Sequence, residues 1–188
     1  MTAYCLFVLF FGLVNAGIEI PRDNCDWRGA HWGDFIACDG DQIAIGACGS
    51  GKDGYCLGSY YTAIQCCTFD GFYYGGCEVA NSIDWGVPVS CVGLNGQNHL
   101  VESLCGSGGG KDCDGHSHET KCCVGHVEGK VVGTTGSCDW KYTSVWSEEL
   151  TCGRADEAVM GICGSGENKD CPGDSVHGIY CCELVEIA

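Results

Sequence analysis

Cysteines are the residues of this chain whose number and spacing most clearly indicate chemistry. They make up 19 of the 188 residues. Thiolates can bind zinc, but structural zinc sites usually contain Cys-x2-4-Cys pairs, and the sequence has none. Two adjacent cysteines cannot readily place both sulfurs on one small tetrahedral site. The spacing therefore favours disulfides, which form in oxidising compartments.

Apart from Cys5, the cysteines follow one pattern three times, C-x12-13-C-x9-13-C-x7-C-x8-9-C-C. The three sets are Cys25, Cys38, Cys48, Cys56, Cys66 and Cys67, then Cys77, Cys91, Cys105, Cys113, Cys122 and Cys123, then Cys138, Cys152, Cys163, Cys171, Cys181 and Cys182. We predict that all of these pair, although spacing alone leaves about 15 connectivities open for each set.

The order of four separated cysteines followed by a pair resembles that of beta-defensin-type peptides. This resemblance implies a first-to-fifth, second-to-fourth and third-to-sixth pairing. It covers the cysteine order only. The spacings here are longer and the charge is opposite to that of the cationic membrane-active peptides, so their activity is not inferred for this chain.

Other residues repeat with the cysteines. The third and fourth cysteines of each set enclose a loop that begins Gly-Ser-Gly and contains Lys-Asp, and a tryptophan follows the first cysteine by seven or eight residues. A tryptophan beside polar groups can bind a sugar or anchor a protein interface. The alternatives are that each tryptophan is core and that each Lys-Asp is a local ion pair. The candidate ligand-binding residues are Trp32, Trp85, Trp146, Lys52, Asp53, Lys111, Asp112, Lys169 and Asp170.

No set of residues predicts catalysis. Gly-Ser-Gly differs from the Gly-x-Ser-x-Gly nucleophile elbow, and its glycines favour a turn. His116, His118 and His126 occur in the second set only, and we interpret them as a solvated loop rather than a metal site. We therefore expect no enzyme activity, no catalytic residue, no metal and no cofactor.

The beginning of the chain predicts secretion. Residues 1–16 contain an apolar run and end in Val14-Asn15-Ala16, which has the small-residue spacing of a signal-peptide cleavage site. The run is too short to span a bilayer, which argues against the alternative of an uncleaved anchor. We expect a secreted, extracellular protein that is not inserted in a membrane after signal cleavage.

The charge narrows the class of partner. The formal net charge is −16, with 9 Lys and Arg against 25 Asp and Glu. An acidic surface repels nucleic acid and anionic lipid headgroups. An extracellular glycan or protein remains as the expected partner.

The repeats predict a small disulfide-rich, mainly β protein. Its expected divisions are 17–70, 71–128 and 129–188, each a six-cysteine module with a short antiparallel hairpin or three-stranded sheet. Units of about 50 to 60 residues have marginal cores without disulfides. Strand-like segments precede the third cysteine and the cysteine pair of each set, at 42–46, 60–64, 99–103, 117–121, 157–161 and 176–180.

Three hypotheses for function follow. The first is a non-enzymatic, multivalent recognition protein that binds a glycan, in the manner of a lectin. The second is a structural component of an extracellular matrix, egg coat, shell or adhesive secretion, which implies self-association. The third is a defensin-like toxin or protease inhibitor.

Overall fold

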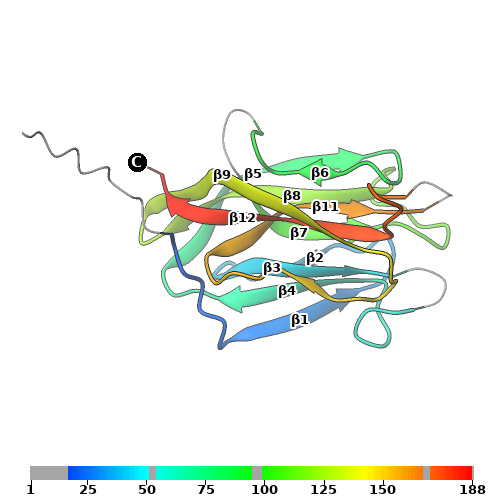
Figure 1. Cartoon of the computed structure of the whole chain (residues 1–188), viewed down its shortest axis with the longest axis horizontal. Coiled ribbons are helices and arrows are strands. Elements are labelled where there is room, and N and C mark those ends of the chain that lie inside the picture. Colours follow the sequence, from blue (N-terminus) through cyan, green and yellow to red (C-terminus); the bar gives the residue numbers. More distant parts are fainter. Residues whose placement is uncertain (1–16, 51–53, 95–98, 167–169, 188) are drawn as a thin grey trace, which may run out of the picture.

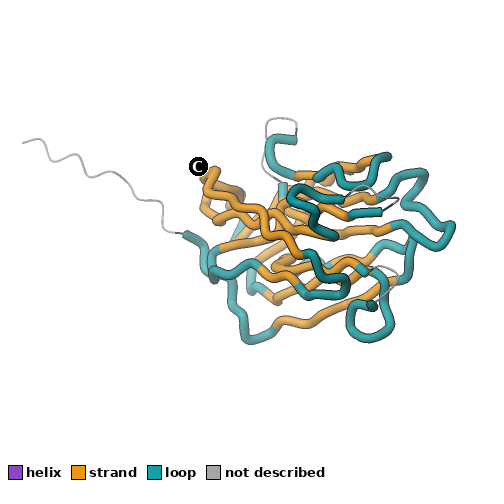
Figure 2. Tube along the Cα trace, turned by 45° about the vertical axis from the view of Figure 1, so that its right-hand side comes forward, coloured by secondary structure: helices purple, strands orange, loops and turns teal. Residues whose placement is uncertain are grey.

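The computed structural model describes residues 17–50, 54–94, 99–166 and 170–187, and all regular structure within them is β-strand (Figure 2). The predicted signal peptide, 1–16, lies outside the described residues. The prediction of a mainly β, disulfide-rich protein with small antiparallel sheets is confirmed.

Each six-cysteine stretch contains one two-residue strand and three longer strands (Figure 1). The first stretch has β1 (Cys25–Ala30), β2 (Ile36–Ala37), β3 (Gln42–Gly49) and β4 (Thr62–Thr68). The second has β5 (Phe72–Ser82), β6 (Val89–Ser90), β7 (Leu100–Gly106) and β8 (His118–Val127). The third has β9 (Lys130–Thr143), β10 (Leu150–Thr151), β11 (Glu157–Gly164) and β12 (His177–Glu186).

The longer strands form the predicted hairpins. β3 pairs with β4, β7 with β8, and β11 with β12, all antiparallel, and a loop that begins Gly-Ser-Gly follows the first strand of each pair. The third long strand, β1, β5 or β9, pairs with the other edge of β4, β8 or β12. This third strand ends two or three residues before the repeated tryptophan.

The disulfides connect the first cysteine of each set to the sixth, the second to the fifth, and the third to the fourth. They are Cys25–Cys67, Cys38–Cys66, Cys48–Cys56, Cys77–Cys123, Cys91–Cys122, Cys105–Cys113, Cys138–Cys182, Cys152–Cys181 and Cys163–Cys171. The pairing implied by the beta-defensin resemblance is therefore wrong.

The strand register explains this connectivity. Cys25 on β1 lies directly across from Cys67 on β4, with their Cα atoms 4.0 Å apart. Adjacent residues in a strand point to opposite faces of the sheet, so Cys66 faces away from Cys67 and bonds Cys38 instead. Each cysteine pair thus fixes its strand to a different segment on each face, as the Cys-Cys spacing predicts.

The two-residue strands join neighbouring stretches, which the sequence analysis did not predict. β2 of the first stretch pairs with β7 of the second, β6 of the second with β11 of the third, and β10 of the third with β3 of the first. The three connections run in one direction and return to their starting point. The stretches are therefore interlocked in a closed ring.

A bulge in each of β3, β7 and β11 accepts a backbone hydrogen bond from the neighbouring stretch. The hairpin register shifts at Ile45, Glu102 and Met160, one in each of β3, β7 and β11. A bulged residue is left out of its own ladder. Its carbonyl is thereby free to accept the backbone N–H of the second cysteine of the neighbouring stretch, at 2.8, 2.9 and 2.7 Å respectively.

The main core lies where β3, β7 and β11 meet one another. Residues at equivalent positions of the three strands contribute to it, four residues and one residue before the third cysteine. These residues are Ala44, Val101 and Val159, and Ala47, Leu104 and Ile162. A second core cluster includes Ile20, Phe72, Met160 and Leu184, and the N-terminal segment joins it where the Ile18 N–H donates to the Leu184 carbonyl at 2.9 Å.

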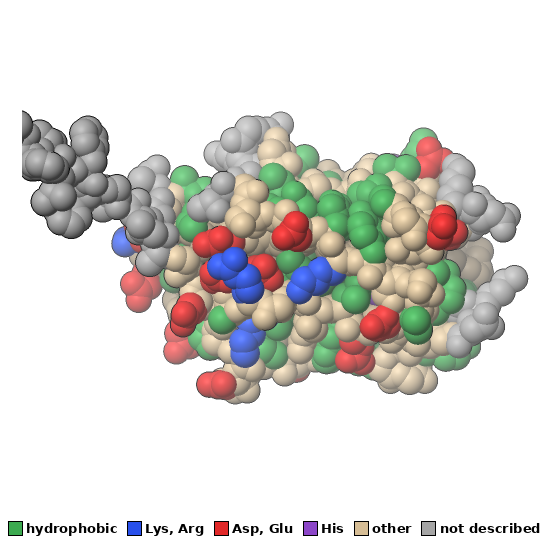
Figure 3. All heavy atoms as spheres, viewed as in Figure 1, with side chains coloured by type: hydrophobic (Ala, Val, Ile, Leu, Met, Phe, Trp, Pro, Cys, Tyr) green, Lys and Arg blue, Asp and Glu red, His purple; other side chains and the backbone are tan. Residues whose placement is uncertain are grey.

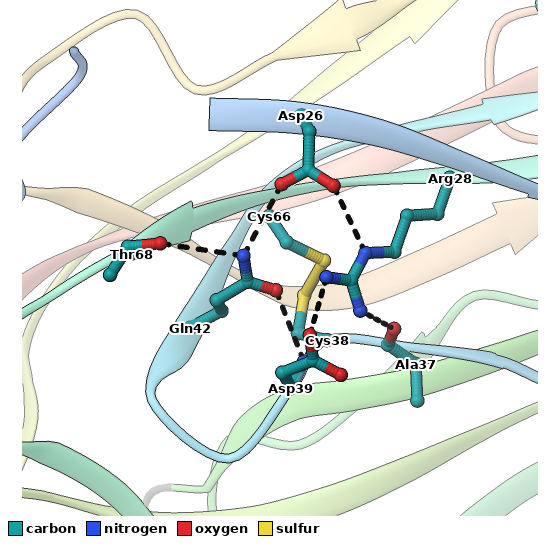
Figure 4. A network of polar contacts seen from close by, with 8 residues as sticks. All are labelled: Asp26, Arg28, Ala37, Cys38, Asp39, Gln42, Cys66 and Thr68. Atoms are coloured by element: carbon teal, nitrogen blue, oxygen red, sulfur yellow. Dashed lines mark hydrogen bonds and ion pairs between the residues drawn. A yellow bond between two sulfur atoms is a disulfide. The ribbon is translucent and has the colours of Figure 1, made fainter. Parts of the chain in front are cut away.

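A basic side chain three residues after the first cysteine ties a long strand to a two-residue strand in the first and third stretches. On β1, the Arg28 guanidinium contacts Asp26, Asp39 and the Ala37 carbonyl (Figure 4), which ties β1 to β2. The hydrogen bond from Arg28 lowers the pKa of Asp39. In the third stretch the equivalent Lys141 donates to the Thr151 carbonyl of β10 at 3.0 Å. This repeated polar contact therefore has a structural role.

Candidate ligand-binding pocket

The repeated tryptophans come together. Trp32, Trp85 and Trp146, which are separated by more than 50 residues in sequence, line one pocket where the three stretches meet. We call this the central pocket.

The contacts between neighbouring stretches position each tryptophan. The residue after the tryptophan donates its backbone N–H to a glycine carbonyl of the neighbouring stretch: Gly33 to Gly106 at 3.0 Å, Gly86 to Gly164 at 2.9 Å, and Ser147 to Gly49 at 3.1 Å. The three donor residues have positive φ, at 81°, 74° and 64°. A tight left-handed turn thus directs each indole toward the loop of its neighbour.

Trp32 and Trp85 also pack against glycines of the neighbouring stretch. A Cβ added to Gly108 would lie 2.5 Å from the Trp32 ring, and one added to Gly166 would lie 2.6 Å from the Trp85 ring. Trp32 stacks on Tyr61 with ring centroids 3.8 Å apart. All three tryptophans are half-buried and form part of the pocket wall.

The inner part of the central pocket is narrow and mostly apolar. Its volume is about 80 Å³. Its lining includes Ala47, Leu104 and Ile162, each next to the third cysteine of its set. None of the described residues that line it is Asp, Glu, Lys or Arg. A charged group would enter it without a counter-charge, which is costly, so the inner pocket suits a neutral group.

Serines of the Gly-Ser-Gly loops supply polar atoms to this pocket. Their backbone N–H groups each donate to the carbonyl of the residue that precedes the second strand of the same hairpin. These bonds are Ser50 to Tyr61 at 2.8 Å, Ser107 to Ser117 at 3.0 Å and Ser165 to Val176 at 2.9 Å, and they hold the serines in place. Ser50 is 9% exposed and Ser165 is 6% exposed. Within the described part of the chain, neither hydroxyl has a hydrogen-bond partner. Buried hydroxyls are normally satisfied, so these two are buried polar groups of the pocket lining that still lack a partner.

Two histidines line the pocket at equivalent positions, where the first stretch has Thr62. The Nε2 of His118 lies 2.8 Å from the Val87 carbonyl, and the Nε2 of His177 lies 2.8 Å from the Glu148 carbonyl. A carbonyl only accepts, so Nε2 carries the proton and Nδ1 is the acceptor atom of the neutral ring. Neither Nδ1 has a partner among the described residues. The interpretation of His118 as part of a solvated loop is wrong, because it is buried on β8.

Burial of these histidines predicts that acidification destabilises the fold. Desolvation lowers the pKa of His118 and His177, more than the carbonyl contacts raise it. The unfolded chain, with a His pKa of about 6.5, then binds more protons than the folded chain, so stability falls as the pH drops below about 6.5. Urea unfolding at pH 7.5 and pH 5 should show this loss.

The paired variant His118→Gln/His177→Gln is the control, because it removes both buried imidazoles. The pH-dependent loss should be smaller in the variant. An equal loss in both proteins would show that the two histidines do not cause it.

A second, wider cavity of about 1120 Å³, which we call the vestibule, shares all three tryptophans with the central pocket. Its lining includes Lys111, Asp112 and Asp170. Lys52, Asp53 and Lys169 lie outside the described residues. Lys111 and Asp112 are exposed and are not among the ion pairs of the described residues. Asp112 instead accepts the Gly115 N–H at 3.1 Å. Charges thus occur at the mouth of the pocket, on a protein whose acidic side chains are spread over the face in Figure 3.

Sequence reasoning identified the tryptophans but missed the serines and histidines as pocket residues. The serines had a signal, because Gly-Ser-Gly repeats in all three loops, but the glycines alone account for a turn. The histidines had a weaker signal in the sequence, because the first stretch has Thr62 at the position of His118 and His177.

No three His, Cys, Asp or Glu side chains in the described ranges are arranged to hold a metal ion. The same ranges contain no helical segment with the length and apolar character of a membrane span. No protein-family model, curated protein or solved structure matches the chain.

Proposed function

We propose that this chain is a secreted, non-enzymatic recognition protein that binds a neutral glycan in the central pocket. We further propose that the three six-cysteine stretches are copies of one module, closed into a ring so that together they form a single site. The convergence of Trp32, Trp85 and Trp146 on one pocket is the observation that carries the proposal.

The chemistry of the pocket supports a glycan. A sugar combines apolar C–H groups with hydroxyls that both donate and accept hydrogen bonds. The pocket offers indoles and aliphatic side chains beside the hydroxyls of Ser50 and Ser165 and the Nδ1 atoms of His118 and His177. Nine disulfides fit an extracellular protein, where glycans are abundant ligands.

The arrangement favours one site per chain over three. Three repeated tryptophans suggested a multivalent protein, in which tandem sites combine weak affinities. The residue after each tryptophan bonds a glycine of a neighbouring stretch, and all three tryptophans line one pocket, so no stretch holds a complete site by itself. We therefore propose that recognition depends on the whole ring.

A glycan array on the full oxidised protein tests the proposal. We expect the native protein to bind a defined set of neutral glycans and the Trp85→Ala variant to lose more than about tenfold in affinity, because hot-spot tryptophans contribute at least about 2 kcal/mol. The matched control is Trp140→Ala. Trp140 is also half-buried, but it stacks on Tyr142 and Tyr180 and does not line the pocket.

Ser165→Ala serves as a second pocket variant in case Trp85→Ala does not fold. An array that is blank for the correctly disulfide-bonded protein would contradict the proposal. Equal loss of binding in the Trp85 and Trp140 variants would place the site elsewhere.

A further inference from the structure

We infer that the central pocket binds the terminal residue of its glycan end-on, with an acetamido group in the inner pocket. The ligand class is therefore a neutral glycan that ends in an N-acetylhexosamine. This inference rests on the proposed function and specifies the ligand of the same site.

The first step concerns size. Ligand pockets for whole small molecules usually measure about 300 to 1,000 Å³. The inner pocket, at about 80 Å³, is much smaller, whereas the vestibule measures about 1120 Å³. The inner pocket thus has room for one substituent of a sugar ring, and the vestibule has room for the ring and the next residues. A pocket closed at its floor by Ala47, Leu104 and Ile162 cannot let a glycan chain pass through. It therefore selects a chain end.

The second step concerns the chemistry of the substituent. The floor is aliphatic, and Ser50, Ser165, His118 and His177 are among the lining residues, with buried hydroxyls and Nδ1 atoms that have no hydrogen-bond partner among the described residues. An acetamido group has a methyl for the floor, an N–H for an imidazole acceptor, and a carbonyl for a serine hydroxyl. A hydroxymethyl group lacks the methyl. A carboxylate or ammonium would be buried without a counter-charge among the described lining residues.

The third step concerns orientation. The pocket framework repeats three times, but its polar groups do not, because Thr62 occupies the position of His118 and His177. On the first stretch, Tyr61 also stacks on Trp32. A fully symmetric pocket would hold a ligand in three equivalent orientations. Because His118 and His177 lie on two of the three stretches and Thr62 on the other, the three orientations are not equivalent. A substituent with one N–H and one carbonyl can therefore bind in one preferred orientation.

The test is calorimetric titration of the full oxidised protein with N-acetylglucosamine and N-acetylgalactosamine, and with glucose and galactose as the parent sugars. We expect at least one acetamido sugar to bind about tenfold or more tightly than its parent, the discrimination that a filled apolar pocket provides. Ala47→Val, which narrows the floor, should remove that preference. Ser165→Ala should weaken acetamido binding by about threefold to tenfold, the worth of one hydrogen bond, and Ser59→Ala, at an exposed serine, should not.

The outcomes separate the two proposals. Glycan binding that requires Trp85 but shows no preference for acetamido sugars would overturn this inference and leave the proposed function in place. Absence of binding to every glycan on the array and to all four sugars would overturn both. If Ala47→Val fails to form the native disulfides, the comparison of Ser165→Ala with Ser59→Ala still decides whether the inner pocket contacts the acetamido group.

Discussion

Replacing both Cys91 and Cys122 by alanine is expected to lower the free energy of unfolding by about 4 kcal/mol. Their disulfide closes 31 residues and lies in the main core, where both sulfurs are fully buried. It also holds the segment that leads from β6 to the hairpin of the second stretch, and the Cys91 N–H bonds the Met160 carbonyl of the third. Its loss should therefore weaken two stretches at once.

The double variant Cys105→Ala/Cys113→Ala is the matched comparison. Its disulfide closes only 8 residues in the Gly-Ser-Gly loop. Because a disulfide restricts the unfolded chain less when it closes a shorter loop, the expected loss in the free energy of unfolding is only about 2.5 kcal/mol. Guanidinium unfolding of both variants measures the difference. A smaller loss for the Cys91–Cys122 variant than for the loop variant would contradict the role assigned to the core disulfide.

Gly161→Val is expected to destabilise the protein by about 2 to 3 kcal/mol through overpacking. Gly161 on β11 pairs with Ser90 of β6, and an added Cβ would lie 2.7 Å from the Val89 carbonyl oxygen. That oxygen belongs to backbone, so a rotamer change cannot relieve the clash. The equivalent Gly46 has the same closeness to the Leu150 carbonyl of β10, at 2.6 Å. The substitution should thus weaken the pairing of β6 with β11.

Gly40→Val is the control, because nothing lies within 4 Å of a Cβ added to Gly40 and its φ is not positive. Thermal unfolding, together with hydrogen exchange of the Cys91 amide, reads out the effect. Unchanged stability and unchanged protection of that amide in the Gly161 variant would show that the exchanged strands do not hold the ring together.

The cysteine pattern predicted much of the fold for a physical reason. Adjacent cysteines in a strand must find partners on opposite faces, and apolar segments of five to eight residues beside them are typical of buried strands. The hairpins at 42–49 with 62–68 and their equivalents follow from these two facts. The connectivity did not follow, because spacing does not show that Cys25 and Cys67 lie directly opposite in register.

The ring and the central pocket could not be predicted from local patterns. The exchanged strands are only two residues long, Ile36–Ala37, Val89–Ser90 and Leu150–Thr151, too short for a period-2 signal. Their acceptor carbonyls arise from bulges in the partner strands, which depend on tertiary contacts. Repetition of Trp32 in Trp85 and Trp146 indicated a shared role, but it did not distinguish three separate sites from one.

The number of ligands bound per chain tests the central claim most directly. Calorimetric titration of the full protein with the tightest-binding glycan from the array gives this number. Because residues from all three stretches line one pocket, we predict one ligand per chain, and loss of that binding on alanine substitution of any one of Trp32, Trp85 or Trp146. Three ligands per chain, each lost independently with one tryptophan, would contradict a single shared site.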